Sequence, residues 1–113
     1  MELSAYERGV VVGLIIGEGS FTGDARKASL AISMHVRHRE LLEWLADRVP
    51  ASRLYGPYHH SGRHFMRWML RGRGLADFVD EIEPDIQALC PHVASRIAEM
   101  RNRYGLTMQT PAR

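Results

Sequence analysis

Hydrophobic positions recur along the chain with two different periods, and their succession predicts an ordered series of helices and strands. Residues 4–16 have helical spacing, and Ser4 with Glu7 three residues later has the pattern of a capping box at a helix start. Residues 28–37 and 64–71 alternate between apolar and polar side chains, which is typical of strands with one buried face. Two further strands are expected at 20–24 and 52–58.

The remaining segments read as helices. Residues 39–49 carry leucines at helical spacing before Pro50, Leu75 to Ile82 fit the same period, and a last helix is expected from Pro91 to Gly105. The predicted order is αββαββαα, an α+β fold in which two hairpins form a four-stranded antiparallel sheet with helices on one face. We expect one domain over residues 1–106 and a loose C-terminal tail at 107–113.

Composition fits this picture and excludes some classes of protein. A chain of 113 residues with 45% hydrophobic residues can bury one core. No apolar run approaches the roughly 18 residues of a membrane span, so no membrane partner is expected. No signal peptide is evident, and the single cysteine, Cys90, cannot form an internal disulfide. We therefore expect a cytoplasmic (intracellular) protein.

Charge is unevenly distributed, although the net charge is only +2. The stretch between Asp47 and Asp77 contains no acid and holds six arginines, and a run of acids follows it. A GC-rich genome would explain the preference for arginine over lysine but not this segregation of sign. A basic surface is the usual footprint of nucleic-acid binding. After Arg48, which follows Asp47 directly, these arginines are Arg53, Arg63, Arg67, Arg71 and Arg73.

The most informative segment is the first helix. Gly9, Gly13 and Gly17 recur every four residues and therefore line one helical face, which lets another backbone approach closely. That backbone could be a second copy across a two-fold axis or the chain's own second helix. Glu18 follows at the negative end of the helix dipole, where a carboxylate is disfavoured unless a cation is present. A two-fold pair would bring two such carboxylates together.

Residues 11–21, VVGLIIGEGSF, resemble the LAGLIDADG motif of homing endonucleases in its LAGLIDGEGSF variant. Ser20 and Phe21 match the tail of the motif, whereas Ile16 stands where the family commonly has Asp. The resemblance implies an αββαββα fold and a homodimer interface formed by the motif helix. It also implies Mg²⁺, or another divalent cation such as Mn²⁺, held by the Glu18 carboxylate and assisted by the Gly17 carbonyl.

The resemblance further implies that the open face of the sheet lies along double-stranded DNA, where arginine can read guanine in the major groove. His38 stands near the point where the family often has a Gln that organises water, so it is a candidate catalytic residue; a plain surface histidine is the alternative. Many active relatives carry a lysine after the third helix, and residues 87–92 contain none. The candidate DNA contacts are Ser33, His35, Arg37, Arg53, Arg67 and Arg71.

These features predict a homodimeric, sequence-specific DNA endonuclease that hydrolyses phosphodiester bonds with a divalent metal at a pseudo-palindromic site. The alternative is a protein that keeps the DNA-binding fold but has lost cleavage, acting as a regulator or an RNA-splicing maturase. A dimerising module without nucleic acid is a third possibility. His59, His60 and His64 could suggest zinc, but a surface turn is the simpler interpretation of that spacing.

Overall fold

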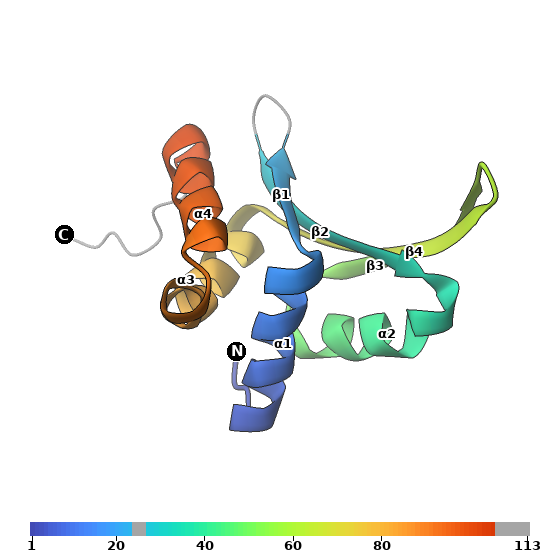
Figure 1. Ribbon diagram of the computed structural model, residues 1–113, viewed down its shortest axis with the longest axis horizontal. Coiled ribbons are helices and arrows are strands. Elements are labelled where there is room, and N and C mark those ends of the chain that lie inside the picture. The colour runs from blue at the N-terminus through green and yellow to red at the C-terminus, as the bar shows by residue number, and fades with distance from the viewer. Residues whose placement is uncertain (24–26, 106–113) are drawn as a thin grey trace.

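A four-stranded antiparallel sheet forms one layer of the molecule, and helices form the other (Figure 1). The computed structural model describes residues 1–23 and 27–105. Across the sheet the strand order is β1-β2-β4-β3, and the predicted αββαββαα order is confirmed. The elements are α1 (Ala5–Glu18), β1 (Ser20–Gly23), β2 (Ala28–His35), a 3₁₀ turn η1 (Val36–His38), α2 (Arg39–Arg48), β3 (Arg53–His60), β4 (Arg63–Arg71), α3 (Gly72–Leu89) and α4 (Pro91–Tyr104).

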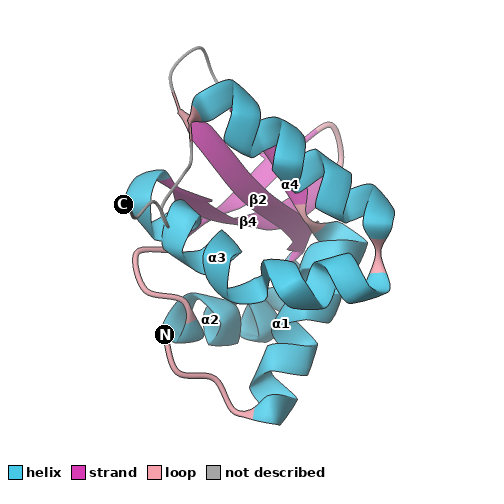
Figure 2. Ribbon diagram, turned by 90° about the vertical axis from the view of Figure 1, so that its left-hand side faces the viewer, coloured by secondary structure: helices cyan, strands magenta, loops and turns pink. Residues whose placement is uncertain are grey.

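The helices cover one face of the sheet, because apolar residues alternate along β2 and β4 and point to that side (Figure 2). Leu30 pairs with Leu70 and Ile32 with Trp68 across β2 and β4, and all four are essentially buried. The alternation predicted for 28–37 and 64–71 therefore identified the buried face correctly. Apolar helix residues complete this core: Val11, Val12, Ile15, Leu42, Leu45, Leu75, Phe78, Val79, Ile82, Ile86, Ile97 and Met100.

Strand β2 ends two residues earlier than its alternating pattern predicts. The chain turns at Val36–His38 into η1, where the backbone N–H of Arg37 donates to Nδ1 of His35 at 3.0 Å. This local bond competes with continuation of the strand, as side-chain to backbone bonds often do. Placing Arg37 on the strand was therefore wrong, because it lies in the turn that follows.

The second hairpin is longer than predicted. Strand β3 continues to His60, with a register shift between Tyr55 and Tyr58 where Gly56-Pro57 interrupts the pairing. Proline is accommodated because β3 is an edge strand, so no neighbour needs its missing N–H. Ser61 and Gly62 both have positive φ and form the two-residue turn, as the primed hairpin turns require.

No helix within the described residues is long and apolar enough to cross a membrane. Two other expectations extend beyond the described ranges. Asp24, the last residue of the predicted 20–24 strand, lies outside them, and so does the tail expected at 107–113.

Helix α1 begins with the predicted capping box and is anchored there to α2. The Ser4 hydroxyl accepts from the Glu7 N–H at 3.1 Å, and the Glu7 carboxylate accepts from the Ser4 N–H at 2.9 Å. The second carboxylate oxygen of Glu7 accepts from Nε of Arg48 at 2.9 Å. The cap therefore also links α1 to the C-terminal end of α2.

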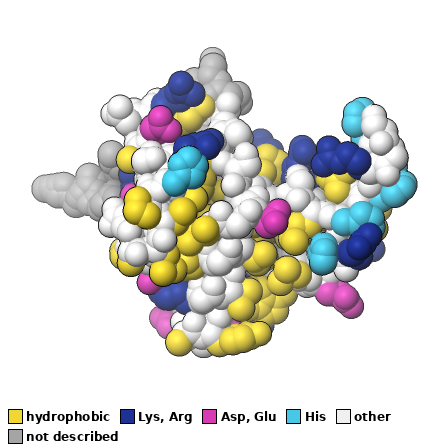
Figure 3. All heavy atoms as spheres, viewed as in Figure 1, with side chains coloured by type: hydrophobic (Ala, Val, Ile, Leu, Met, Phe, Trp, Pro, Cys, Tyr) yellow, Lys and Arg dark blue, Asp and Glu magenta, His cyan; other side chains and the backbone are white. Residues whose placement is uncertain are grey.

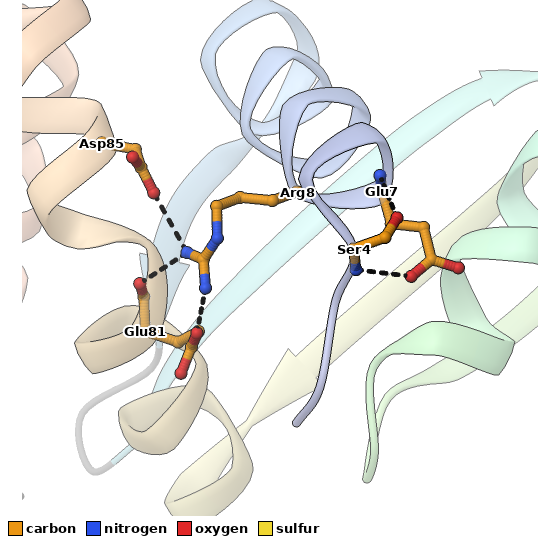
Figure 4. A network of polar contacts seen from close by, with 5 residues as sticks. All are labelled: Ser4, Glu7, Arg8, Glu81 and Asp85. Carbon is orange, nitrogen blue, oxygen red and sulfur yellow. Dashed lines mark hydrogen bonds and ion pairs between the residues drawn. The ribbon is translucent and has the colours of Figure 1, made fainter.

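A second anchor joins α1 to α3 (Figure 4). The guanidinium of Arg8 donates to the Glu81 carbonyl at 3.1 Å and to the Asp85 carboxylate at 3.0 Å, and it also pairs with the Glu81 carboxylate. Because Glu7 and Arg8 are adjacent, the start of α1 is held between two helices. The opposite end of α1 is thereby directed at the sheet (Figure 1).

The Glu7 anchor should make stability depend on acidity. The Ser4 backbone N–H, followed by Arg48, lowers the pKa of Glu7 below 4.5, because both favour the carboxylate. This stabilisation is present above pH 4.5 and is lost as the pH falls through the folded-state pKa. We expect Glu7→Gln to lower the free energy of unfolding at neutral pH, with the difference from wild type narrowing below pH 4.5 in denaturant titrations.

The matched control is Glu2→Gln, at an exposed glutamate that precedes α1. Its pH profile should follow that of the wild type. A gap between Glu7→Gln and wild type that stays constant at every pH would contradict the proposed linkage.

Candidate nucleic-acid and metal site

Glu18 is the last residue of α1, whereas the sequence placed it just past the helix end. The helix continues because the Gly19 N–H donates to the Ile15 carbonyl at 3.0 Å, and β1 begins one residue later. A Cβ at Gly19 would lie 2.6 Å from that carbonyl oxygen, so this abrupt change from helix to strand requires glycine. The chain geometry thereby fixes the Glu18 backbone at the edge of the sheet.

The surroundings of Glu18 suit a cation. The side chain is exposed and forms no hydrogen bond or ion pair with any other described residue. The last turn of α1 contains no basic residue, so the negative helix end is uncompensated within the helix. The carbonyl of Gly17 follows the last intrahelical acceptor, Ile15, and is one of the free carbonyls at a helix terminus.

These donors are oxygens, which Mg²⁺ and Mn²⁺ prefer. Within residues 1–23 and 27–105, however, no three His, Cys, Asp or Glu side chains gather closely enough to hold a metal. One copy of the chain therefore offers part of a coordination shell. Mg²⁺ commonly uses one or two protein carboxylates and completes its shell with substrate phosphate and water. The donor set at Glu18 fits that mode of binding.

A hollow of about 370 Å³ lies beside Glu18, and we call it the Glu18 hollow. Ser33 and Arg67, two of the predicted DNA contacts, line it together with Glu18. The sequence did not predict the other residues that line the hollow, because the position of the short strand β1 relative to β2 follows only from their pairing, Ser20↔Ala31. The lining residues are Glu18, Ser20, Thr22, Ala31, Ser33, Arg67 and Met69.

The face of the sheet away from the helices, here called the open face, is basic. None of the four described strands contains an acidic residue, whereas α3 carries five, on the other layer. Of the six predicted DNA contacts, five belong to this face and Arg37 lies just beyond it in η1. The open face comprises Ser20, Thr22, Ser29, Ala31, Ser33, His35, Arg53, Tyr55, Tyr58, His60, Arg63, Phe65, Arg67, Met69 and Arg71.

Arginine and histidine side chains gather along the projecting β3–β4 arm (Figure 3). The ends of the sheet rise away from the helices, so the open face is curved like a trough (Figure 1). Arg53 and Arg71 line a second hollow there with Tyr55 and Met69. Four of the five arginines named from the sequence therefore lie on the open face, whereas Arg73 and the acids that follow it belong to α3.

His35 and His38 lie at the end of β2 and the start of α2. His35 accepts from both the backbone N–H and Nε of Arg37, at 3.0 and 3.2 Å. Desolvation, and then the positive charges of Arg37, His64 and His38, lower the pKa of His35. His38 is exposed and makes no side-chain cap to α2, and it is not among the described residues that line the Glu18 hollow. Its catalytic role stays a prediction.

The glycine face of α1 is open to solvent. Gly9, Gly13 and Gly17 are exposed, and a Cβ at any of them would meet no described atom within 4 Å outside the helix itself. The chain's own second helix therefore does not cover this face, which removes one of the two partners that the sequence allowed. Apolar side chains flank α1 in the same view (Figure 3), and Leu14 and Ile16 are only half-buried.

The hairpin histidines do not form a three-histidine cluster. His59 and His64 face each other across β3 and β4, with their Nδ1 atoms 2.5 Å apart. His60 follows His59 directly in the strand and therefore points to the opposite face. No third side chain of a metal-ligating type joins the pair within the described part of the chain. The interpretation of this segment as a surface turn is consistent with that geometry.

The fold is similar to that of an archaeal intron-encoded homing endonuclease solved in complex with DNA, with a TM-score of 0.57 and 16% sequence identity. The match covers 70% of this chain and 57% of that one, so this chain spans little more than half the length of that protein. No known family model matches the sequence, and no curated protein does. The likeness confirms the predicted homing-endonuclease-like α+β fold.

The cluster around His35 has a measurable consequence. Desolvation favours the neutral ring, and the positive charge of Arg37, whose N–H groups are directed at Nδ1, acts in the same direction. We expect the pKa of His35 to lie below 6.5 and Arg37→Gln to raise it, as followed by NMR titration of the ring protons.

Arg39→Gln provides the control, because Arg39 pairs with Glu43 at 3.7 Å and is not among the groups that perturb His35. This variant should leave the titration unchanged. If Arg37→Gln also leaves it unchanged, the proposed cause is wrong.

Proposed function

We propose that two copies of this chain pair through α1 and hydrolyse double-stranded DNA with a divalent cation at Glu18. The observation that carries the proposal is the position of Glu18. It is an unpaired carboxylate at a helix end, and it lines a hollow on a sheet face that has no acid of its own. The similarity of the fold to a DNA-bound homing endonuclease supports it.

Pairing through α1 explains the exposed glycine face. Small residues at every fourth position allow two helices to approach backbone to backbone, and a two-fold axis presents the same face from each copy. The two Glu18 residues would then lie close together at the sheet ends of the helices. Two open faces related by the same axis would form one continuous DNA-binding surface, which fits a pseudo-palindromic site.

DNA binding would use the arginines of the trough. Arg53, Arg67 and Arg71 lie on one face at known register, where guanidinium groups can contact phosphates or bidentately bind guanine edges. Ser33 and His35 supply shorter polar groups on the neighbouring strand, and Arg37 supplies a further charge at its end. The acids of α3 lie in the helix layer, away from this surface.

The Glu18 carboxylate and the Gly17 carbonyl would hold Mg²⁺ or Mn²⁺, with the second copy, the scissile phosphate and water completing the shell. Such a cation supplies Lewis-acid stabilisation of the phosphate and lowers the pKa of a bound water. Glu18 would position the cation, because it lies at the fixed end of α1. His38 is proposed to position water, and the unit that carries these groups is proposed to be a single domain spanning residues 1–106.

A DNA-binding protein without cleavage is the second candidate. It is favoured by two sequence features, namely Ile16 in the motif and the absence of lysine from residues 87–92. Such a protein, a regulator or a maturase, would keep the trough and the paired α1 helices. Only a test of cleavage separates it from the nuclease.

The glycine face offers a test of pairing in which folding and association change in opposite directions. Gly13→Leu adds bulk where a single copy has free space, and leucine is a better helix former than glycine by roughly 0.8 kcal/mol. We expect the monomer to remain folded or to become more stable, while the dimer is lost in sedimentation measurements.

Ala88→Leu is the matched control, because Ala88 is an exposed helical position on α3. It should change neither the fold nor the mass in solution. A Gly13→Leu protein that sediments as the wild type does would exclude α1 as the interface.

Removal of the Glu18 charge tests the metal and the reaction together. We expect wild-type protein to linearise members of a plasmid library with randomised inserts in Mg²⁺, and Glu18→Gln to lose this cleavage while still binding DNA. In EDTA, Glu18→Gln should dimerise more tightly than wild type, because two adjacent carboxylates repel each other. Mg²⁺ should tighten the wild-type dimer only.

These results separate the three candidate classes. Salt-sensitive DNA binding with no cleavage of any plasmid supports the regulator or maturase, since phosphate contacts weaken as salt rises. A dimer that does not bind DNA supports the plain dimerising module. Equal cleavage by wild type and Glu18→Gln would disprove the metal site.

A further inference from the structure

The Glu18 hollow contains a cation of its own. Arg67 projects from β4 on the open face, and it is the one basic side chain among the described residues that line the hollow. We propose that Arg67 is a catalytic residue that contacts the scissile phosphate opposite Glu18 and stabilises the charge of its transition state. This inference rests on the proposed function and names a group in the same site.

The sheet register sets these groups in a row. Ser33 pairs with Arg67 across β2 and β4, and Ser20 pairs with Ala31 across β1 and β2. Glu18 ends α1 two residues before Ser20, and its side chain lines the same hollow as Ser33 and Arg67. Strands β1 and β4 flank β2, and with strands about 4.8 Å apart their backbones are about 10 Å apart, which leaves room for a phosphate above β2.

Arg67 is held in this row by its neighbours. Its Nε donates to the hydroxyl of Ser33 at 3.1 Å, and its guanidinium carbon lies 5.6 Å from the centre of the Phe65 ring. The bond to Ser33 uses Nε and leaves the two terminal NH₂ groups for a ligand. A planar guanidinium whose orientation is fixed by a bond at Nε is well suited to binding two oxygens of a phosphate.

The other basic candidates lie elsewhere. Lys27, the only lysine, lines a separate hollow with Thr22, Ser29 and Arg71. His92 lies in the first turn of α4, in the helix layer, and it is not among the described residues that line the Glu18 hollow. Arg71 is four residues along β4 from Arg67, at the level of Ser29.

The reaction needs such a charge. A water oxygen forms a bond to phosphorus while the bond from phosphorus to the 3′ oxygen breaks. One proton leaves the water for solvent, and the 3′ oxygen takes up a proton to end as a hydroxyl. Negative charge grows on the phosphate oxygens between these events, and a preorganised guanidinium beside them stabilises it more in the transition state than in the bound substrate.

The test separates cleavage rate from affinity. Plasmids that wild-type protein cuts are recovered from a randomised-insert library and used in single-turnover cleavage with saturating protein in Mg²⁺. Affinity for the same duplexes is measured in EDTA. Arg67→Ala should lower the cleavage rate by about 10²–10³-fold, the usual loss for one transition-state donor, and change the affinity by less than about tenfold.

Three further variants make the assignment specific. Arg67→Lys should restore part of the rate, because it returns the charge but not the two-pronged geometry. Ser33→Ala should lower the rate less than Arg67→Ala, since it removes only the bond that orients the guanidinium and leaves its charge in place. Arg71→Ala removes a matched charge from the same strand, and its defect should appear in affinity.

The outcomes are distinguishable from failure of the proposed function. If Arg67→Ala cuts at the wild-type rate once saturated, or if its defect is the same as that of Arg71→Ala, Arg67 is a DNA contact only and the assignment is overturned. If wild-type protein cuts no plasmid, the nuclease proposal and this role fall together. Thermal unfolding of each variant identifies any loss that comes from misfolding.

Discussion

The structure depends on helix α1, which packs against the rest of the described chain on one side only. Val11, Val12 and Ile15 bury one side of α1 in the core, and the anchors at Glu7 and Arg8 hold its start between α2 and α3. The other side presents three glycines that no described part of the chain covers. Because the start of α1 is held and its end is fixed by Gly19, the position of Glu18 follows from packing that lies far from it.

The fold was largely predictable because its two layers carry different periods. Alternation in 28–37 and 64–71 identified the buried strand face, and apolar spacing identified the helices. The misplaced boundaries have local causes. At β2, a bond from the Arg37 N–H to His35 ends the strand. Helix α3 extends beyond the 75–82 stretch whose spacing indicated a helix, past Pro84 to Leu89, and Ile82 and Ile86 on either side of the proline are fully buried.

The candidate site was predictable only in part. Glu18 was identified from its place between two glycines and from the charge at a helix end, both of which are local properties. The hollow could not be derived in that way, because it depends on the pairing of β1 with β2 and of β2 with β4. That pairing brings Glu18 and Arg67, which are 49 positions apart, to the same hollow. Their spacing in the sequence does not predict this proximity.

The residues that matter for folding and those proposed for function hardly overlap. Gly9, Gly13, Gly17, Glu18 and Arg67 are all exposed, whereas the core consists of other positions. Genetic drift could therefore silence such a protein one surface substitution at a time while every descendant remains well folded. Related genes would then be expected to include many that encode a folded protein without the proposed activity, because substitutions at exposed positions leave the core unchanged.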